Sequence, residues 1–308
     1  MVSLALPALD PATTRGGASP RPTPALPILG LFAVAAAFGF VFWAFVLTVR
    51  GQWVDEQALV GAKRFLAADA TQAASMSWLN HLPEVVGLVC AAGLVVCAIL
   101  RRDVVVPLLA ALAAGLAMIA TQLLKHGLLT RPDLGVSAAW GNSFPSGHTT
   151  VAAAATVALV LAAPAHGRTV LAVLGALASA VTGAATVIMG WHRPSDVVGA
   201  FLVAAFCSLL GALAIGGVQA FRARVELGRR SAPPRTPAAG WLSWLCPPVG
   251  IVAVAVAVGL SAPGVSMAGQ GGTDDPGLYV GAGLLFIAGA ALIVFPLMEL
   301  VSRRWLRD

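Results

Sequence analysis

Long apolar stretches alternate with short polar segments along most of this chain. Eight of the stretches are long enough to cross about 30 Å of hydrocarbon as helices that rise roughly 1.5 Å per residue. They are Ile28–Val49, Pro83–Leu100, Val104–Leu124, Ser146–Ala163, Thr169–Gly190, Asp196–Val218, Trp241–Ala262 and Leu278–Val301. The pattern predicts an all-α, polytopic helical bundle in a membrane. In the seventh stretch Pro247, Pro248 and Pro263 leave a kinked or re-entrant segment as an alternative.

The composition agrees with a membrane protein. Hydrophobic residues make up 58% of the 308 residues, charged residues make up 10%, and the mean hydropathy is +0.88, outside the range of ordinary soluble domains. The net charge of +6 and the pI near 9.9 would also fit a nucleic-acid-binding protein. Most basic residues, however, fall in short loops, where they set topology and contact anionic headgroups. No nucleic-acid partner is therefore expected.

The basic residues favour one orientation of the bundle. With the N-terminus in the cytoplasm, 13 basic residues lie on the inner side and 6 on the outer side. The inner set is Arg15, Arg21, Arg101, Arg102, Arg168, Arg222, Arg224, Arg229, Arg230, Arg235, Arg303, Arg304 and Arg307, and the outer set is Arg50, Lys63, Arg64, Lys125, Arg131 and Arg193. The sequence predicts a multi-pass protein of the plasma membrane with both termini cytoplasmic.

The chain divides into four regions. Residues 1–27 are rich in proline and lack an apolar run, which predicts a disordered cytoplasmic tail rather than a signal peptide. Residues 28–218 form a core of six spans, whose outer loop Arg50–Leu82 is expected to lie along the membrane interface. Residues 219–240 form a basic cytoplasmic linker. Residues 241–308 add two spans and a basic tail, which carry no motif and are available for a partner protein or self-association.

The cysteines indicate packing rather than chemistry. Cys90, Cys97 and Cys207 lie inside predicted spans and Cys246 beside one, so neither a disulfide framework nor a zinc site is expected. No other residues show the spacing of metal ligands, and no cofactor is predicted. The bias toward alanine, valine and glycine, and toward arginine over lysine, is typical of a GC-rich bacterial genome.

Three short segments place polar residues at the outer mouths of neighbouring spans. They are Lys125–Pro132, Pro145–His148 and His192–Asp196. Lys125 and Arg131 follow the third span, where two isolated cations would also fit simple snorkelling to headgroups. The second segment begins the fourth span with a glycine-containing turn, which is an ordinary helix start but also presents free N–H groups to an anion.

Two histidines and an aspartate complete the set. His148 lies at the edge of a span, where an ionisable group is costly and usually has a partner or a function. His192 and Asp196 are four residues apart, and a carboxylate bound to one imidazole nitrogen leaves the other free as a nucleophile. An isolated pair could merely cap a helix. Together with two cations on the same side of three spans, however, the pair predicts a phosphate site.

These segments resemble the signature motifs of the type 2 phosphatidic acid phosphatase superfamily, which includes glucose-6-phosphatase and the vanadium haloperoxidases. Lys125, Arg131 and Pro132 match the first motif, and Pro145–His148 matches the second. The third is degenerate, because His192 and Asp196 are present but Ala185 and Thr186 replace its serine and arginine. The resemblance covers about residues 83–218.

The resemblance implies roles for these residues. His192 would attack phosphorus, Asp196 would orient it, and His148 would protonate the leaving oxygen and then activate water. The phosphoryl oxygens would be held by Lys125, Arg131, Ser146 and Gly147 without a metal. Arg193, which directly follows His192, is a candidate replacement for the arginine missing at Thr186, or else a surface arginine at headgroup level.

Several functions remain open at this stage. The first is an extracytoplasmic membrane phosphatase for a lipid phosphomonoester or diphosphate, acting through a phosphohistidine. The second is a degenerate, non-catalytic relative that binds a phospholipid or acts as a scaffold, which the absence of arginine at Thr186 would favour. The third is a phosphotransferase that uses the same residues with an acceptor other than water. The five intact motif residues favour the phosphatase.

Overall fold

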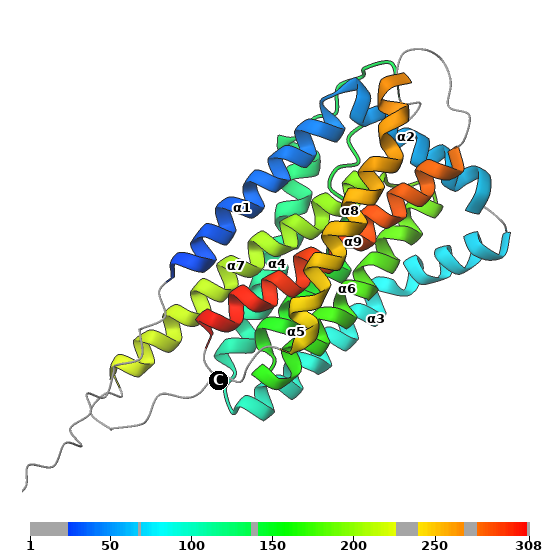
Figure 1. Ribbon diagram of the computed structural model, residues 1–308. Coiled ribbons are helices and arrows are strands. Elements are labelled where there is room, and N and C mark those ends of the chain that lie inside the picture. The colour runs from blue at the N-terminus through cyan, green and yellow to red at the C-terminus, as the bar shows by residue number, and fades with distance from the viewer. Residues whose placement is uncertain (1–23, 67–68, 137–140, 226–239, 268–275, 307–308) are drawn as a thin grey trace, which may run out of the picture.

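The computed structural model describes residues 24–66, 69–136, 141–225, 240–267 and 276–306 (Figure 1). Within these ranges the chain forms nine α-helices, three short π-helical segments and no strand. The α-helices are α1 (Ala25–Val41), α2 (Val49–Gly61), α3 (Asp69–Arg101), α4 (Val105–Leu123), α5 (Gly147–Ala162), α6 (Ala165–Ile188), α7 (Pro194–Val225), α8 (Trp241–Met267) and α9 (Pro276–Trp305). The π-helical segments are η1 (Phe42–Val46), η2 (Ala62–Leu66) and η3 (Leu124–Leu128). The predicted all-α bundle is confirmed.

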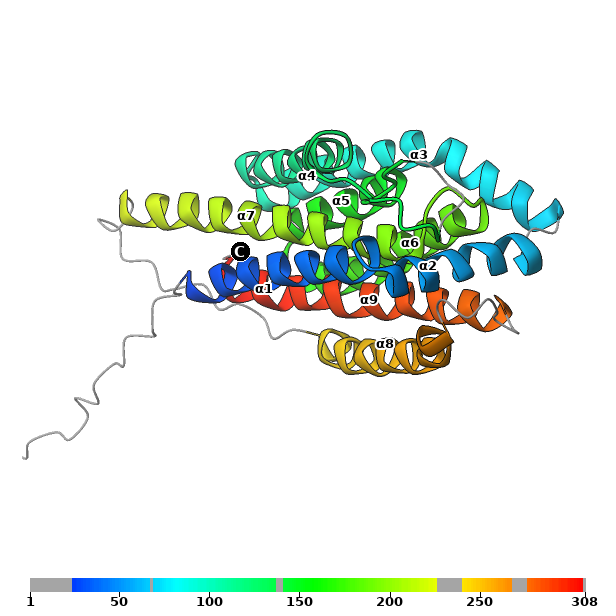
Figure 2. The same ribbon diagram turned by 90° about the horizontal axis from the view of Figure 1, so that it is seen from above.

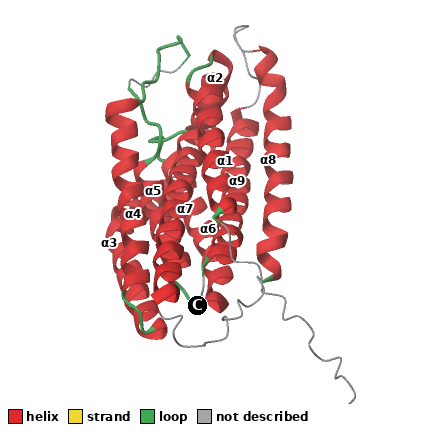
Figure 3. Cartoon of the chain, turned by 90° about the vertical axis from the view of Figure 1, so that its left-hand side faces the viewer, coloured by secondary structure: helices red, strands yellow, loops and turns green. Residues whose placement is uncertain are grey.

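Most of the helices are long and apolar enough to cross a membrane. Among the described residues, the seven candidate spans are Ala25–Val46, Ala70–Arg101, Val105–Leu128, Ala165–Ile188, Pro194–Val225, Trp241–Ala262 and Pro276–Arg303. The apolar helix α5 is shorter, with 16 residues that extend about 24 Å. The helix α2 is not among the spans. The chain therefore has the architecture of a multi-pass membrane protein, with its helices side by side along one direction (Figure 3).

Helix α7 lies at the centre of the bundle. In the apolar 18-residue window of α7, 78% of the residues are buried, whereas 11% are buried in the corresponding windows of α1 and α3. It packs on α1, α4, α5 and α9. Helices α3 and α4 lie toward one edge of the bundle and α8 toward the other (Figures 2 and 3). Apolar side chains on the outside of α3, such as Leu88 and Ile99, are exposed and form part of the surface that faces lipid.

Three predicted boundaries are wrong. Helix α3 begins at Asp69 rather than at Pro83, because the polar and alanine-rich stretch before the proline is also a good helix former and extends the helix beyond its apolar part. Helix α7 continues to Val225, so the predicted linker begins inside a helix; residues 226–239 lie outside the described residues. Helix α1 begins at Ala25, and the rest of the predicted tail, residues 1–23, also lies outside them.

The prolines of the seventh span do not interrupt it. Helix α8 is continuous from Trp241 to Met267 and includes Pro247 and Pro248. Proline removes a backbone donor, but neighbouring helices can compensate for this inside a membrane. Helix α8 also packs closely on α9, since a Cβ added to Gly250 would lie 2.6 Å from the carbonyl oxygen of Gly289 in α9. The re-entrant alternative is therefore not adopted.

Helix α2 occupies the beginning of the predicted interfacial loop. Its polar residues Gln52, Asp55 and Glu56 are buried against the rest of the bundle. Thr48 caps it by accepting a hydrogen bond from the Gly51 amide at 3.1 Å. Because its polar face points into the protein, α2 brings ionisable groups to the end of the bundle where the predicted motifs lie.

Helices α8 and α9 are joined to the core by a buried polar cluster. In this cluster Glu299 forms an ion pair with Arg303 and accepts a hydrogen bond from the Ser243 hydroxyl at 2.8 Å. The Ser243 hydroxyl also lies 3.2 Å from that of Thr169 in α6, and Arg303 donates to the carbonyl of Ala165 at 2.7 Å. Polar contacts of this kind stabilise helix association in a membrane. The two additional helices are therefore an integral part of the bundle.

Candidate active site

The three predicted motifs converge at one end of the bundle. A polar cavity of about 200 Å³ lies there, between η3, the loop before α5, and the turn from α6 to α7. Its lining consists of Leu59, Lys125, Gly141, Asn142, Ser143, Gly190, Trp191, His192 and Arg193. Since one water takes up about 30 Å³ in the liquid, the cavity has room for a phosphoryl group. Three of the predicted site residues, Lys125, His192 and Arg193, contribute to its wall.

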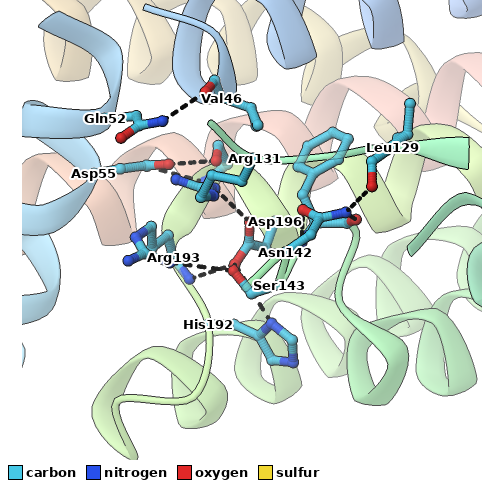
Figure 4. A network of polar contacts seen from close by, with 12 residues as sticks. Val46, Gln52, Asp55, Leu129, Arg131, Asn142, Ser143, His192, Arg193 and Asp196 are labelled. Atoms are coloured by element: carbon cyan, nitrogen blue, oxygen red, sulfur yellow. Dashed lines mark hydrogen bonds and ion pairs between the residues drawn. The ribbon is translucent and has the colours of Figure 1, made fainter. Parts of the chain in front are cut away.

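Asp196 holds the site together (Figure 4). Its side chain is completely buried in the first turn of α7. One carboxylate oxygen accepts a hydrogen bond from Arg131 Nη2 at 3.2 Å, and the other accepts from Ser143 Oγ at 2.6 Å and from the Arg193 amide at 2.9 Å. Its carbonyl accepts from the Ser146 amide at 2.9 Å. One residue thereby connects all three motifs.

His192 lies beside this carboxylate. Its Nδ1 atom is 3.4 Å from Asp196 Oδ2, which is within ion-pair distance but longer than a good hydrogen bond. His192 follows the turn that ends α6. In this turn the Trp191 amide donates to the Thr186 carbonyl and the Gly190 amide donates to the Val187 carbonyl. Gly190 has φ +71°, a conformation that favours glycine. The turn directs the imidazole toward the cavity.

Asn142 fixes the segment that carries Lys125. Its Nδ2 group donates to the carbonyls of Lys125 at 3.2 Å, Leu129 at 3.0 Å and Phe144 at 3.0 Å, and its Oδ1 atom accepts from the Phe144 amide. These bonds join the end of η3 to the loop before α5. The lysine side chain, which is partly exposed, extends from this fixed backbone into the cavity wall.

Arg131 lies behind Asp196 and does not line the cavity. Its side chain is 3% exposed and donates to Asp196 through Nη2. Its Nε and Nη1 atoms are buried without a hydrogen-bond partner among the described residues. Because buried donors are costly when unsatisfied, this guanidinium can take a further acceptor.

The second motif forms the beginning of α5. Ser146 is its N-cap, and the serine hydroxyl accepts from the Thr149 amide at 3.4 Å. Gly147 follows as the first helical residue. The His148 ring lies 5.3 Å from the ring of Trp191, which directly precedes His192. Trp191 and His192 line the polar cavity, and His148 lies next to it through its contact with the Trp191 ring.

Arg193 lines the cavity but is strongly paired. Its Nε and Nη2 atoms donate to one carboxylate oxygen of Glu56 at 3.2 and 2.9 Å, and its Nη1 atom donates to Ser143 Oγ at 3.2 Å. The position of the family's arginine, Thr186, is completely buried, and its hydroxyl donates to the Gly183 carbonyl. Arg193 is therefore a cation at the cavity wall, and its charge is offset by a carboxylate from α2.

Helix α2 supplies the residues that the motifs do not contain. Asp55 accepts hydrogen bonds from the amide and the hydroxyl of Ser195, and burial raises the pKa of Asp55 to about 7, against the lowering effect of Arg131. Gln52 donates to the carbonyls of Val46 and Pro132, at 2.8 and 2.9 Å. In the sequence, the role of α2 at the site was indicated only by two adjacent acidic residues, Asp55 and Glu56, in a largely apolar chain.

Lys63 in η2 is a further cation close to the cavity. A Cβ added to Gly190 would lie 2.6 Å from Lys63 Cε and 3.5 Å from its Nζ, so this side chain passes directly over the turn before His192. Within the described residues, no group of three or more histidine, cysteine, aspartate or glutamate side chains could hold a metal ion. The charged residues around His192 are the cations Lys63, Lys125 and Arg193 and the carboxylates Asp196 and Glu56.

Residues 104–218 match the family model of the PAP2 superfamily. This part of the chain is a PAP2 superfamily domain. The PAP2 match contains every motif residue discussed above, from Lys125 to Asp196, whereas α2, α8 and α9 lie outside it. PAP2 domains are generally phosphatases, so the match supports a phosphoric ester hydrolase at a coarse level. Neither the curated proteins nor the solved structures contain a match to the chain.

Proposed function

We propose that the protein is a membrane lipid phosphatase that hydrolyses a phosphomonoester or diphosphate through a phosphohistidine at His192. One observation carries the proposal: His192 lines a polar cavity with Lys125 and lies 3.4 Å from the buried carboxylate of Asp196. A carboxylate at Nδ1 stabilises positive charge on the imidazole and leaves Nε2 available to phosphorus.

The chemistry requires two steps. In the first, His192 Nε2 forms a bond to phosphorus while the bond from phosphorus to the leaving oxygen breaks, and His148 gives its proton to that oxygen. In the second, water attacks phosphorus, the phosphorus–nitrogen bond breaks, and His148 takes a proton from the water. Lys125 stabilises the charge on the phosphoryl oxygens throughout. Arg131 and the N-terminus of α5 are further candidate donors.

A lipid substrate is supported by the surroundings of the site. An apolar cavity of about 340 Å³ lies between α1, α4 with η3, and α7. Leu124 and Leu128, at the two ends of η3, are part of its wall, and Lys125 of the polar cavity belongs to the same π-helical turn. A lipid could thus place its phosphate at Lys125 and a hydrocarbon chain along the apolar side of this turn. The extracytoplasmic location of the site rests on the distribution of basic residues.

The mechanism is tested with the purified chain in detergent and a panel of lipid phosphates. We expect phosphate release that survives chelation of divalent metals, is inhibited by vanadate as an analogue of the transferring phosphoryl group, and is lost in His192→Ala. Loss on the order of 10³ or more is expected for removal of a nucleophile. The matched control is His81→Ala, since His81 is exposed on α3.

Alkaline quenching of enzyme incubated with phosphate-labelled substrate traps the intermediate, because a phosphohistidine is stable to base, and the label should then be lost when the trapped protein is exposed to acid. Unchanged turnover in His192→Ala would eliminate the mechanism. Release of the phosphoryl group to an added alcohol instead of water would assign the protein to the phosphotransferases. Binding of lipid phosphate without any turnover would identify the non-catalytic relative, which the degenerate third motif keeps as the second candidate.

A further inference from the structure

A cavity outside the PAP2 match lies between the two additional helices and the rest of the bundle. It has a volume of about 470 Å³ and is enclosed by η1, by α2, and by the facing sides of α8 and α9. Most of its wall is apolar, with Phe45 and Phe286 stacked at 5.5 Å between ring centroids. Ala257 of α8 and Ala282 of α9 are buried and also line it. Without α8 and α9 this cavity would not exist.

The cavity is separate from the polar cavity of the active site. The two have no lining residue in common. Pro194 lines the apolar cavity, whereas the preceding Arg193 lines the polar one. Between them, α2 is fastened to this turn by the pairs Asp55–Ser195 and Glu56–Arg193. A substrate chain would have to break these buried contacts to pass from one cavity to the other, so the occupant of the apolar cavity is a different molecule.

The rim of the cavity indicates what that molecule is. Trp43 and Val258 line the cavity and are each 57% exposed, so it opens on the outer surface of the bundle. In a bilayer such an opening meets hydrocarbon chains. Arg50 also lines the cavity, is exposed, and forms no ion pair within the described part of the chain. A cation at the mouth of an apolar cavity is complementary to an amphiphile with an anionic head.

We propose that this cavity binds one anionic phospholipid of the surrounding bilayer, with a chain along the sides of α8 and α9 that face α2 and its phosphate at Arg50. The lipid would fill the space between the additional helices and the core and would hold them together. It would also act close to the active site, because a Cβ added to Gly283 of α9 would lie 2.7 Å from Pro194 Cγ and 3.2 Å from Ala58 Cβ of α2.

The test counts lipids on the purified full-length protein by native mass spectrometry. After exchange into detergent with phosphatidylglycerol or phosphatidylcholine, we expect one retained phosphatidylglycerol and little phosphatidylcholine.

Ala282→Phe and Ala257→Phe fill the cavity and should weaken retention by roughly tenfold or more. Ala255→Phe is the matched control, because Ala255 lies on the exposed side of α8 and does not line the cavity. Its retention should equal that of the wild type.

Arg50→Gln provides a second test that does not fill the cavity. Because Arg50 is exposed, this variant should fold, and it should lose the preference for phosphatidylglycerol over phosphatidylcholine. Equal retention of the two lipids by the wild type, retention of phosphatidylglycerol by a folded Ala282→Phe, or equal loss in Ala255→Phe would each overturn the proposal. Since the readout is a lipid count and not phosphate release, its failure is distinguishable from failure of the proposed phosphatase function.

Discussion

At the scale of single residues, Arg193 shows how a cation can be present at a phosphate site and yet be partly neutralised. Its guanidinium is shared between Glu56 and Ser143, and the serine in turn donates to Asp196. Removing it would leave the Glu56 carboxylate facing a cavity that must bind an anion. The effect of substitution therefore has two parts, a lost donor and an exposed negative charge.

We expect Arg193→Ala to lower kcat/KM by on the order of 10², as for other lost stabilising donors. Glu56→Gln in the Arg193→Ala background should recover part of this loss, because the negative charge that Arg193 had offset is then removed. Steady-state kinetics of the two single variants and the double variant form the cycle. If kcat/KM of Arg193→Ala stayed within about twofold of the wild-type value, Arg193 would not be the replacement for the family's arginine, whose position is occupied by Thr186.

Asp55 should give the stability of the protein a particular pH dependence. Burial raises its pKa in the folded state from 3.8 to about 7, so between these values the folded state binds more protons than the unfolded state. Stability from this group is consequently highest at low pH, falls as the pH rises toward 7 by at most about 1.4 kcal/mol per unit, and is level above that.

Thermal unfolding of the wild type and of Asp55→Asn between pH 5 and pH 8 isolates this contribution. Asparagine has nearly the same shape but does not titrate, so the wild type should lose stability relative to the variant as the pH rises to 7. Parallel pH profiles for the two proteins would contradict the assignment of a raised pKa to Asp55.

At the scale of elements, α2 positions the first motif although it lies outside the PAP2 match. Gln52 alone provides donors to two carbonyls, one at the end of η1 and one at Pro132 in the loop after η3. The Gln52 side chain is 1% exposed and Val46 is fully buried, so the Val46 carbonyl would be left without a partner if the amide were lost.

Gln52→Ala should lower the free energy of unfolding by about 1–3 kcal/mol, the cost of leaving the buried Val46 carbonyl unpaired. Thermal unfolding in detergent measures the loss, and Val60→Ala on the exposed side of the same helix serves as the control. If the two variants had equal melting temperatures, Gln52 would not hold the loop in place.

The spans could be predicted from the sequence because hydrophobicity over about 20 residues is a local property. The convergence of Lys125, His148, His192 and Asp196 was also accessible, since alternate helix ends meet at one membrane surface. The pairing of Glu56 with Arg193 was not, because it joins positions 137 residues apart and depends on how α2 is folded back onto the bundle. The length of α3 was missed for a different reason: helix propensity continues beyond the apolar stretch that marks the membrane.

At the scale of the whole molecule, the orientation in the membrane is open to a direct test. The split of 13 to 6 basic residues predicts that the active site faces outward. Asp133, in the loop after η3, and Arg224, near the end of α7, are exposed at positions expected on opposite sides.

In intact cells, Asp133→Cys should react with a membrane-impermeant maleimide, and Arg224→Cys should react only after permeabilisation. The wild-type chain is the control, because three of its four cysteines are buried and Cys90 is only partly exposed. The reverse labelling pattern would place the active site in the cytoplasm.

The π-helical turn η3 limits how the length of the chain can vary during evolution. Its Leu129 amide bonds to the Leu124 carbonyl, five residues earlier, so the turn contains one residue more than an α-helical turn. Deletion of one residue here would restore an ordinary helix and rotate whatever follows by about 100°, which would separate Arg131 from Asp196. When homologous chains are aligned, a single-residue gap in this turn therefore signals a rebuilt phosphate site, whereas a gap of the same size in the loop between α3 and α4 carries no such meaning.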